Sequence, residues 1–203
     1  MKTGNSTDTK QLILDVAERH FALYGFAGTS LRGIIKEAGV NVAAIAYHFG
    51  EKEEVFRAVI RRFATPVVAE QLRMLSQVDE TDLRSVLSAF YLPPLELVKS
   101  KGKASATLAL FLGRVQTEPE PIFQIVDEQF ADCRRRFIEA FRSSLRSPSE
   151  ADLQWHFEFM LSLIVCFLTR QSEIRRRYSD LSEWKPEEAA KRMVDFCLNG
   201  MTH

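Results

Sequence analysis

The sequence contains few residues of the kinds that cross-link small secreted proteins or interrupt helices. Three of its 203 residues are Cys, nine are Gly and seven are Pro. The cysteines, at 133, 166 and 197, are far apart and form no CxxC or Cys/His pair, which argues against a zinc site and against a disulfide framework. We expect all three to be buried as small hydrophobic residues. The scarcity of Gly and Pro predicts a mostly helical chain.

A long apolar run is also missing. The longest nearly apolar stretch, Met160 to Leu168, spans nine residues, whereas a helix needs about 20 to cross a bilayer. The N-terminal stretch MKTGNSTDTK is polar and has no apolar core of a signal peptide. The sequence therefore predicts a cytoplasmic protein without a membrane partner.

Net charge is absent as well, because 27 Lys and Arg balance 27 Asp and Glu. This balance argues against a broad basic surface of the kind that many nucleic-acid-binding proteins carry. Residues 1–63 hold nine Lys and Arg against seven Asp and Glu, which leaves +2 there and −2 in the remainder. A nucleic-acid interface would have to be one compact face.

What the sequence does contain is two short amphipathic helices joined by a tight turn, between residues 26 and 56. The first is predicted to open with Thr29 as its N-cap and to end at Gly39. Its apolar positions lie at offsets 0, 3, 4 and 7, and are Leu31, Ile34, Ile35 and Ala38. The second helix repeats these offsets with Val42, Ile45, Ala46 and Phe49, which leaves Ala43, Ala44, Tyr47 and His48 facing outward.

An outward helix face without acidic residues suits a groove lined by phosphates, so this helix-turn-helix predicts DNA binding. The same geometry also occurs as plain packing in helical proteins. An earlier helix is expected from about Asp8 to Tyr24, and a later one from Lys52. The buried stripe of the earlier helix is Ile13, Val16, Ala17, His20, Phe21 and Tyr24, with His20 as a partnered core histidine.

Further helices are expected at about 81–99, 104–116, 121–146, 150–170 and 186–199. The predicted fold class is therefore all-α. An N-terminal three-helix DNA-binding domain with the helix-turn-helix occupies residues 1–56, and a larger helical domain for ligand binding and dimerisation occupies residues 57–203.

Residues 10–58 resemble the DNA-binding domain of the TetR family of bacterial repressors. The matching pieces are ILDVAERHFALYGFAGTSLRGI, the AGV turn, the helix ending in YHF, and GEKEEVF. The remainder of the chain resembles the family only in helical character. The run NVAAIAYHFGEKE is similar to the family branch with an N-x-A-A-x-x-Y-H-F-G pattern, which includes repressors of fatty-acid metabolism released by long-chain acyl ligands.

The resemblance implies which residues contact the DNA backbone. Thr29 and Arg32 match phosphate-contacting positions at the start of the second helix, where backbone N–H groups favour anions. Lys52 matches a lysine that grips the backbone, and His48 matches an aromatic residue near phosphate. Ala46 departs from the family, which usually has an aromatic residue there, so Tyr47 and His48 are expected to replace that contact.

The resemblance also implies base reading by Val42, Ala44 and Tyr47, next to Ala43 on the same outward face. Val and Ala offer only apolar contacts, best to a thymine methyl, and Tyr47 can donate one hydrogen bond. We therefore expect DNA shape and water to carry part of the specificity. A homodimer would place two such helices about 34 Å apart, on successive major grooves of a palindromic operator.

Eleven of the fifteen Phe residues lie at or beyond position 63. Aromatic residues at helical spacing are usually core, but the family forms a ligand cavity from the helices after its DNA-binding domain. The expected lining residues are Phe63, Phe90, Phe111 and Phe123. Arg114 could pair with a ligand carboxylate, or be solvated or paired with Glu118. The family pairs its last two long helices across a two-fold axis, which implies dimerisation through 150–170 and 186–199.

The expected function is a transcriptional repressor of double-stranded palindromic DNA that a small apolar ligand releases. Two alternatives stay open, a constitutive DNA-binding dimer without a ligand and an all-helical enzyme with a vestigial DNA-binding domain. The sequence shows no Ser/His/Asp, Cys/His or metal constellation at readable spacing and no glycine-rich phosphate loop. Neither enzyme activity, a metal site nor a cofactor is therefore expected. The sequence does not specify the operator, the ligand or the regulated genes, nor whether the protein represses or activates them.

Overall fold

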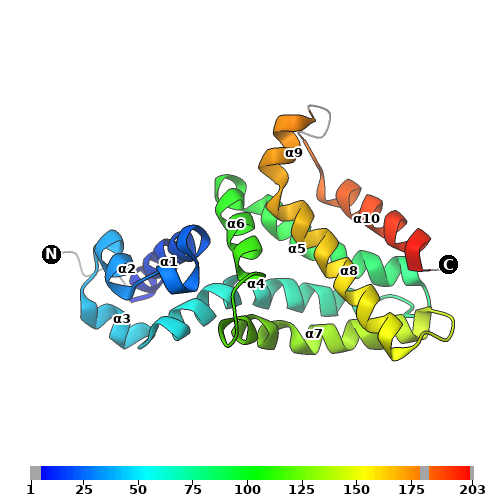
Figure 1. The fold of residues 1–203 in the computed structure, drawn as a ribbon, viewed down its shortest axis with the longest axis horizontal. Coiled ribbons are helices and arrows are strands. Elements are labelled where there is room, and N and C mark those ends of the chain that lie inside the picture. The colour runs from blue at the N-terminus through cyan, green and yellow to red at the C-terminus, as the bar shows by residue number, and fades with distance from the viewer. Residues whose placement is uncertain (1–5, 179–182, 202–203) are drawn as a thin grey trace. The chain divides into compact units, whose positions relative to one another are not determined.

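The computed structural model describes residues 6–178 and 183–201, and within these ranges every regular element is a helix. The all-α prediction is confirmed. The elements in chain order (Figure 1) are α1 (Ser6–Gly28), α2 (Leu31–Ala38), α3 (Val42–His48), α4 (Lys52–Leu75), α5 (Leu83–Ser100), a 3-10 turn (Gly102–Ala104), α6 (Ser105–Val115), α7 (Ile122–Ser144), α8 (Glu150–Thr169), α9 (Gln171–Arg177) and α10 (Pro186–Met201). Among these α-helices only α9 was not predicted, because it is short and follows α8 without a Gly or Pro between them.

The chain packs as two compact units. Unit 1 comprises the described residues of Met1–Ala64 and Leu110–Gln129, and unit 2 those of Thr65–Ala109 and Phe130–His203. The helix-turn-helix therefore packs in one unit with the C-terminal part of α6 and the start of α7. The functional division at residue 56 stays a prediction, since a packing unit is not a functional domain.

An aromatic cluster forms the centre of unit 1. Phe56 on α4 lies edge-to-face on Phe21 and Phe26 of α1, with ring centroids 5.0 and 5.3 Å away, and on Phe111 of α6 at 6.1 Å. The predicted burial of Tyr24 is wrong, because its side chain is 57% exposed. The backbone of α1 leaves the helical path at the next residue, so the buried stripe continues through Phe26 instead.

The core of unit 2 is also aromatic. Phe90 on α5 lies edge-to-face on its neighbour Tyr91, on Phe137 of α7 and on Phe157 of α8, with centroids 5.2–5.7 Å apart. The side chains of Tyr91 and Phe137 are fully buried. The two units thus each have a core of their own.

Two of the three cysteines belong to the core of unit 2, as predicted. The Cys133 thiol donates to Gln71 Oε1 at 3.3 Å, and Cys197 Sγ lies 3.1 Å from the Tyr91 hydroxyl. Burial raises the pKa of Cys133 to about 12 and that of Cys197 above its usual value, so both are unreactive thiols. Cys166 is exposed, and its predicted burial is wrong, because the side of α8 that carries it faces away from the core.

That side of α8 is an exposed apolar face. The side chains of Trp155 and Phe159 are 61% and 63% exposed, and their rings stack with centroids 5.5 Å apart. Phe196 on α10 is 71% exposed. Among the described helices, α8 alone is long and apolar enough to cross a membrane by length and composition. An exposed apolar face of this kind marks an interaction surface.

Candidate nucleic-acid interface

The first helix of the helix-turn-helix begins one residue later than predicted. Ser30, in extended conformation, is the N-cap of α2, and its Oγ accepts a hydrogen bond from Gly33 N at 3.1 Å. The prediction that Thr29 is the N-cap is wrong, because its side chain is buried and its hydroxyl donates to Gly25 O at 2.7 Å. Gly39 ends α2 in the left-handed conformation with φ 64°, as predicted.

The second helix, α3, is held by a cap and a single buried side chain. The Asn41 side chain accepts a hydrogen bond from Ala44 N at 2.8 Å and so fixes the first turn. Ile45 is 2% exposed and is the buried anchor of the helix, which packs against α1 and α2. A helix of seven residues offers room for one such anchor.

Of the three other predicted anchors, Val42 and Ala46 are wrong, because Val42 is 68% exposed and Ala46 is exposed, and Phe49 is half-buried at the C-cap of α3. Ile45 is the one residue of α3 that is buried. Val42 therefore joins the outward face that the resemblance assigns to base reading. That face comprises Val42, Ala43, Ala46 and Tyr47, which are exposed, and Ala44 and His48, which are half-buried.

Tyr47 is the most prominent side chain of this face. It is 80% exposed, and its ring meets the His48 ring edge-to-face with centroids 4.9 Å apart. α3 contains no carboxylate. Arg32 and Lys36 are exposed on α2. The face can thus offer methyl groups, one phenol and one imidazole to a groove without repelling phosphates.

The one carboxylate of α2 is neutralised by neighbours on α1. Glu37 accepts hydrogen bonds from Arg19 Nη2 at 2.8 Å and pairs with His20 Nε2 at 2.7 Å. Arg19 and then His20 hold the pKa of Glu37 below its usual value. The prediction that His20 is a partnered core histidine is confirmed, since its side chain is only 14% exposed. This pair fixes α2 on α1.

Lys52, at the start of α4, has partners inside unit 1. Its ammonium group donates to Phe26 O at 2.9 Å and to Thr29 O at 3.0 Å, and lies 4.1 Å from the centre of the Phe26 ring. These partners lie 23 and 26 residues away in sequence, so local pattern could not reveal them. The contact of Lys52 with the DNA backbone stays a prediction. In addition, Lys52 holds the end of α1 through these hydrogen bonds, a role that the resemblance did not imply.

Arg114 and Glu118 contact the end of α1. Arg114 Nη2 donates to Leu23 O at 3.1 Å, and Glu118 Oε1 accepts from Phe26 N at 2.8 Å. From the sequence we expected Arg114 to pair with a ligand carboxylate, to be solvated or to pair with Glu118. In the structure its partner is the backbone carbonyl of Leu23. Its contact with a ligand stays a prediction.

The four phenylalanines expected to line a cavity fall in both units. Phe63, Phe111 and Phe123 belong to unit 1, and Phe90 belongs to unit 2. Phe63, Phe90 and Phe111 are buried, and Phe123 is half-buried. Phe111 and Phe90 take part in the aromatic clusters described above, so both are core residues here. Lining of a ligand cavity stays a prediction for all four.

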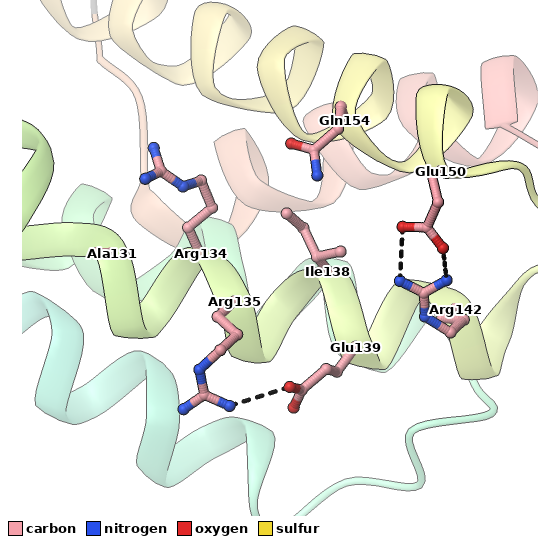
Figure 2. A pocket seen from close by; sticks show the side chains of 8 residues that line it. All are labelled: Ala131, Arg134, Arg135, Ile138, Glu139, Arg142, Glu150 and Gln154. Carbon is pink, nitrogen blue, oxygen red and sulfur yellow. Dashed lines mark hydrogen bonds and ion pairs between the residues drawn. The ribbon is translucent and has the colours of Figure 1, made fainter.

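A groove of about 400 Å³ lies between α7 and α8 in unit 2 (Figure 2). It is lined by Ala131, Arg134, Arg135, Ile138, Glu139, Arg142, Glu150 and Gln154. Arg135 pairs with Glu139 at 3.0 Å, and Arg142 pairs with Glu150. Its two acidic residues each pair with one of its three arginines, so most of the positive charge of the groove is balanced.

The chain matches two family models. Residues 13–59 match bacterial regulatory proteins of the tetR family, and residues 88–200 match the tetracyclin repressor-like C-terminal domain. The first match covers the helix-turn-helix together with the start of α4. The second covers most of unit 2 and the segment Leu110–Gln129 of unit 1, which lies between the two segments of unit 2 in the chain.

Curated relatives are transcription factors. The chain is 36% identical over 81 residues to the transcriptional repressor AcnR of Corynebacterium glutamicum, a match that covers 40% of this chain and 39% of AcnR. It is 28% identical over 136 residues to the transcriptional dual regulator CecR of Shigella flexneri, with 63% and 60% covered. The chain thus spans less than two thirds of each of these relatives.

Solved structures share the fold. The regulator FadR from Bacillus subtilis, in complex with stearoyl-CoA, gives a TM-score of 0.70 at 12% identity, over 94% of this chain and 98% of FadR. The fatty acid degradation regulator FadR from Bacillus halodurans gives 0.72 at 14% identity over 100% of both chains. At these identities the likeness concerns the fold alone.

Proposed function

The protein belongs to the TetR family of bacterial transcriptional regulators, and we propose that it represses its target genes as a homodimer on a palindromic operator. The observation that carries the proposal is the outward face of α3, which is exposed, free of carboxylates and centred on Tyr47. Such a face fits the major groove of double-stranded DNA.

Contacts with DNA divide between bases and backbone in this proposal. Val42, Ala43, Ala44 and Tyr47 contact base edges, with methyl groups against thymine and the phenol as the single donor. The backbone contacts are assigned to Arg32, His48 and Lys52, whereas Thr29, which is buried with its hydroxyl bonded to Gly25 O, is withdrawn from them. Arg32 is the strongest of these assignments, because its side chain is exposed on the first turn of α2.

Dimerisation is assigned to the exposed apolar face of α8 together with Phe196 of α10. Trp155 and Phe159 expose more than half of their side chains to water in the single chain, and a second copy would bury them. The arrangement is isologous, so one patch supplies both sides of the interface. Two copies then present two α3 helices to half-sites one helical turn apart.

Release from DNA is assigned to a small apolar ligand of the cytoplasm. The ligand would favour dimers whose α3 helices are wrongly spaced for the operator, and so shift the population away from the DNA-binding state. Support comes from FadR of Bacillus subtilis, which has this fold and is in complex with stearoyl-CoA. Phe63, Phe90, Phe111, Phe123 and Arg114 are the proposed ligand residues.

The test is selection of duplexes from a random DNA pool by the purified protein, followed by titration of the selected duplex with stearoyl-CoA. The proposal expects enrichment of a palindrome bound by two chains, and release of the duplex by stearoyl-CoA, whose acyl chain is apolar, or by an apolar compound from a panel. Enrichment without release by any compound would favour a constitutive DNA-binding dimer. No enrichment by a well-folded protein would contradict the proposal.

A further inference from the structure

The chain between α1 and α2 turns through a short segment, Gly25–Thr29, which we call the corner. The backbone of α1 leaves the helical conformation at Gly25, where φ is 69° and ψ is −179°. This combination is open essentially to glycine alone. Because the helical path is broken there, backbone N–H and C=O groups beside the break need partners outside α1.

Two side chains from the end of α6 and the segment after it supply these partners. Glu118 Oε1 accepts from the Phe26 N–H at 2.8 Å, and Arg114 Nη2 donates to Leu23 O at 3.1 Å. The four groups lie in unit 1. We call this pair of hydrogen bonds the tie. It joins positions 91 and 92 residues apart in the sequence.

The tie requires close approach as well as hydrogen bonding. A Cβ atom on Gly25 would lie 2.9 Å from Glu118 Oε1 and 3.6 Å from Arg114 Cδ. Glycine at this position therefore serves two purposes, the backbone conformation of the break and the space for the tie. A side chain at this position would therefore disturb both the backbone break and the contact of Glu118 and Arg114 with the corner.

The other side of the corner is bonded to α4 and to itself. Lys52 Nζ donates to Phe26 O and Thr29 O, and Thr29 Oγ1 donates to Gly25 O at 2.7 Å. The next residue, Ser30, caps α2. The corner, together with the contacts of Glu37 with α1, therefore sets the position of α2, and through its short turn that of α3.

We propose that Arg114 and Glu118 are positioning residues for DNA binding, because the tie holds the corner in the conformation that presents α3. The inference rests on the proposed function for its link to DNA. The tie also bonds the end of α6 and the segment after it directly to the DNA-binding helices, so a ligand that displaces the end of α6 would break these bonds. Neither residue touches DNA in this account.

The experiment compares three variants with the wild type. Glu118→Ala removes the acceptor of the Phe26 amide, Glu118→Gln keeps an oxygen in the same place, and Gln116→Ala alters an exposed neighbour outside the tie. The rate of hydrogen exchange at the Phe26 amide, measured without DNA, shows whether its hydrogen bond to Glu118 is formed. Affinity for the selected duplex shows whether the tie affects DNA binding. Circular dichroism at the assay temperature confirms that each variant is folded.

The proposal expects Glu118→Ala to exchange the Phe26 amide about tenfold or more faster than the wild type, and to bind the duplex at least about fivefold more weakly. Glu118→Gln and Gln116→Ala should stay within about twofold of the wild type in both measurements. Rescue by Gln separates the hydrogen bond from the charge. Should Glu118→Ala fail to fold, Arg114→Met, which has no donor for Leu23 O, tests the second bond of the tie with the same expected losses in duplex affinity.

If the Phe26 amide of Glu118→Ala exchanged as slowly as in the wild type, the proposed hydrogen bond of the tie would be contradicted. Faster exchange with wild-type affinity for the duplex would overturn the positioning role. Failure of the wild type to select any duplex would overturn the proposed function instead, and the exchange measurement would still decide whether the tie holds the corner. The two proposals can therefore fail separately.

Discussion

Glu118 accepts a hydrogen bond from the backbone amide of Phe26 at 2.8 Å, although 92 residues separate them. This bond is one of the contacts that join Leu110–Gln129 to the helix-turn-helix in one unit, together with the contact of Phe111 with Phe56. The bond also depends on the break in α1, because the Phe26 N–H can donate to Glu118 only where the helix is interrupted at Gly25.

Substitution of two glycines should separate backbone strain from lost contacts. Gly39→Ala adds a Cβ with no atom within 4 Å, so its cost comes only from the positive φ, about 1–2 kcal/mol. Gly25→Ala meets Glu118 Oε1 at 2.9 Å in a conformation that alanine rarely adopts, so we expect a cost of at least about 3 kcal/mol. Urea unfolding measures both, and equal losses would contradict the close approach at Gly25.

Arg32 and Lys52 should differ in the salt dependence of DNA binding. If Arg32 neutralises one phosphate, Arg32→Ala lowers the slope of log affinity against log salt by about 1 and leaves stability unchanged. Lys52→Met removes two hydrogen bonds to backbone carbonyls, so it should lower the free energy of unfolding by about 1–3 kcal/mol. A Lys52→Met protein of wild-type stability would contradict the internal role of Lys52.

Acid should remove the contribution of Glu37 to stability. Hydrogen bonds from Arg19 and His20 lower its pKa in the folded protein, so the carboxylate stabilises the fold above the unfolded value of about 4.3. That stabilisation is lost as the pH falls through the lower folded value. Glu37→Gln should therefore have a lower Tm than the wild type near neutral pH, and the difference should shrink below about pH 4. A difference independent of pH would contradict this account of the pair.

A charge on the exposed face of α8 should prevent dimerisation. Phe159→Arg places a cation where the proposed interface buries an aromatic ring, so sedimentation should give the mass of one 23.2-kDa chain instead of two. The matched control is Ala69→Arg on α4, which is also exposed. A dimeric Phe159→Arg protein would place the interface elsewhere.

Local sequence patterns predicted the helices and the helix-turn-helix well. Gly39 ends α2 as expected, because a left-handed residue there needs no partner from elsewhere in the chain. Ile45 and Ile34 are buried, as their helical offsets indicated. The resemblance to the TetR family, read from residues 10–58, is confirmed by family matches at residues 13–59 and 88–200.

What the sequence did not reveal depends on contacts between distant residues. Thr29 and Ser30 are both good N-cap residues, and only the hydrogen bond from Thr29 to Gly25 O decides that Ser30 caps α2. Offsets in α3 predicted burial of Val42, but a helix of seven residues docks through Ile45 alone. The partners of Lys52 and Glu118 are backbone groups, which no pattern of side chains marks.

The central claim is that the outward face of α3 reads DNA, and Tyr47→Ala tests it most directly. Tyr47 is 80% exposed, so its removal should leave the Tm unchanged. Affinity of the wild type and of Tyr47→Ala is measured for the selected duplex and for a scrambled duplex. We predict that the variant binds the selected duplex at least about tenfold more weakly, since one specific base contact contributes about 1–3 kcal/mol, while binding to the scrambled duplex is unchanged. Equal affinity of the two proteins for the selected duplex would contradict the claim.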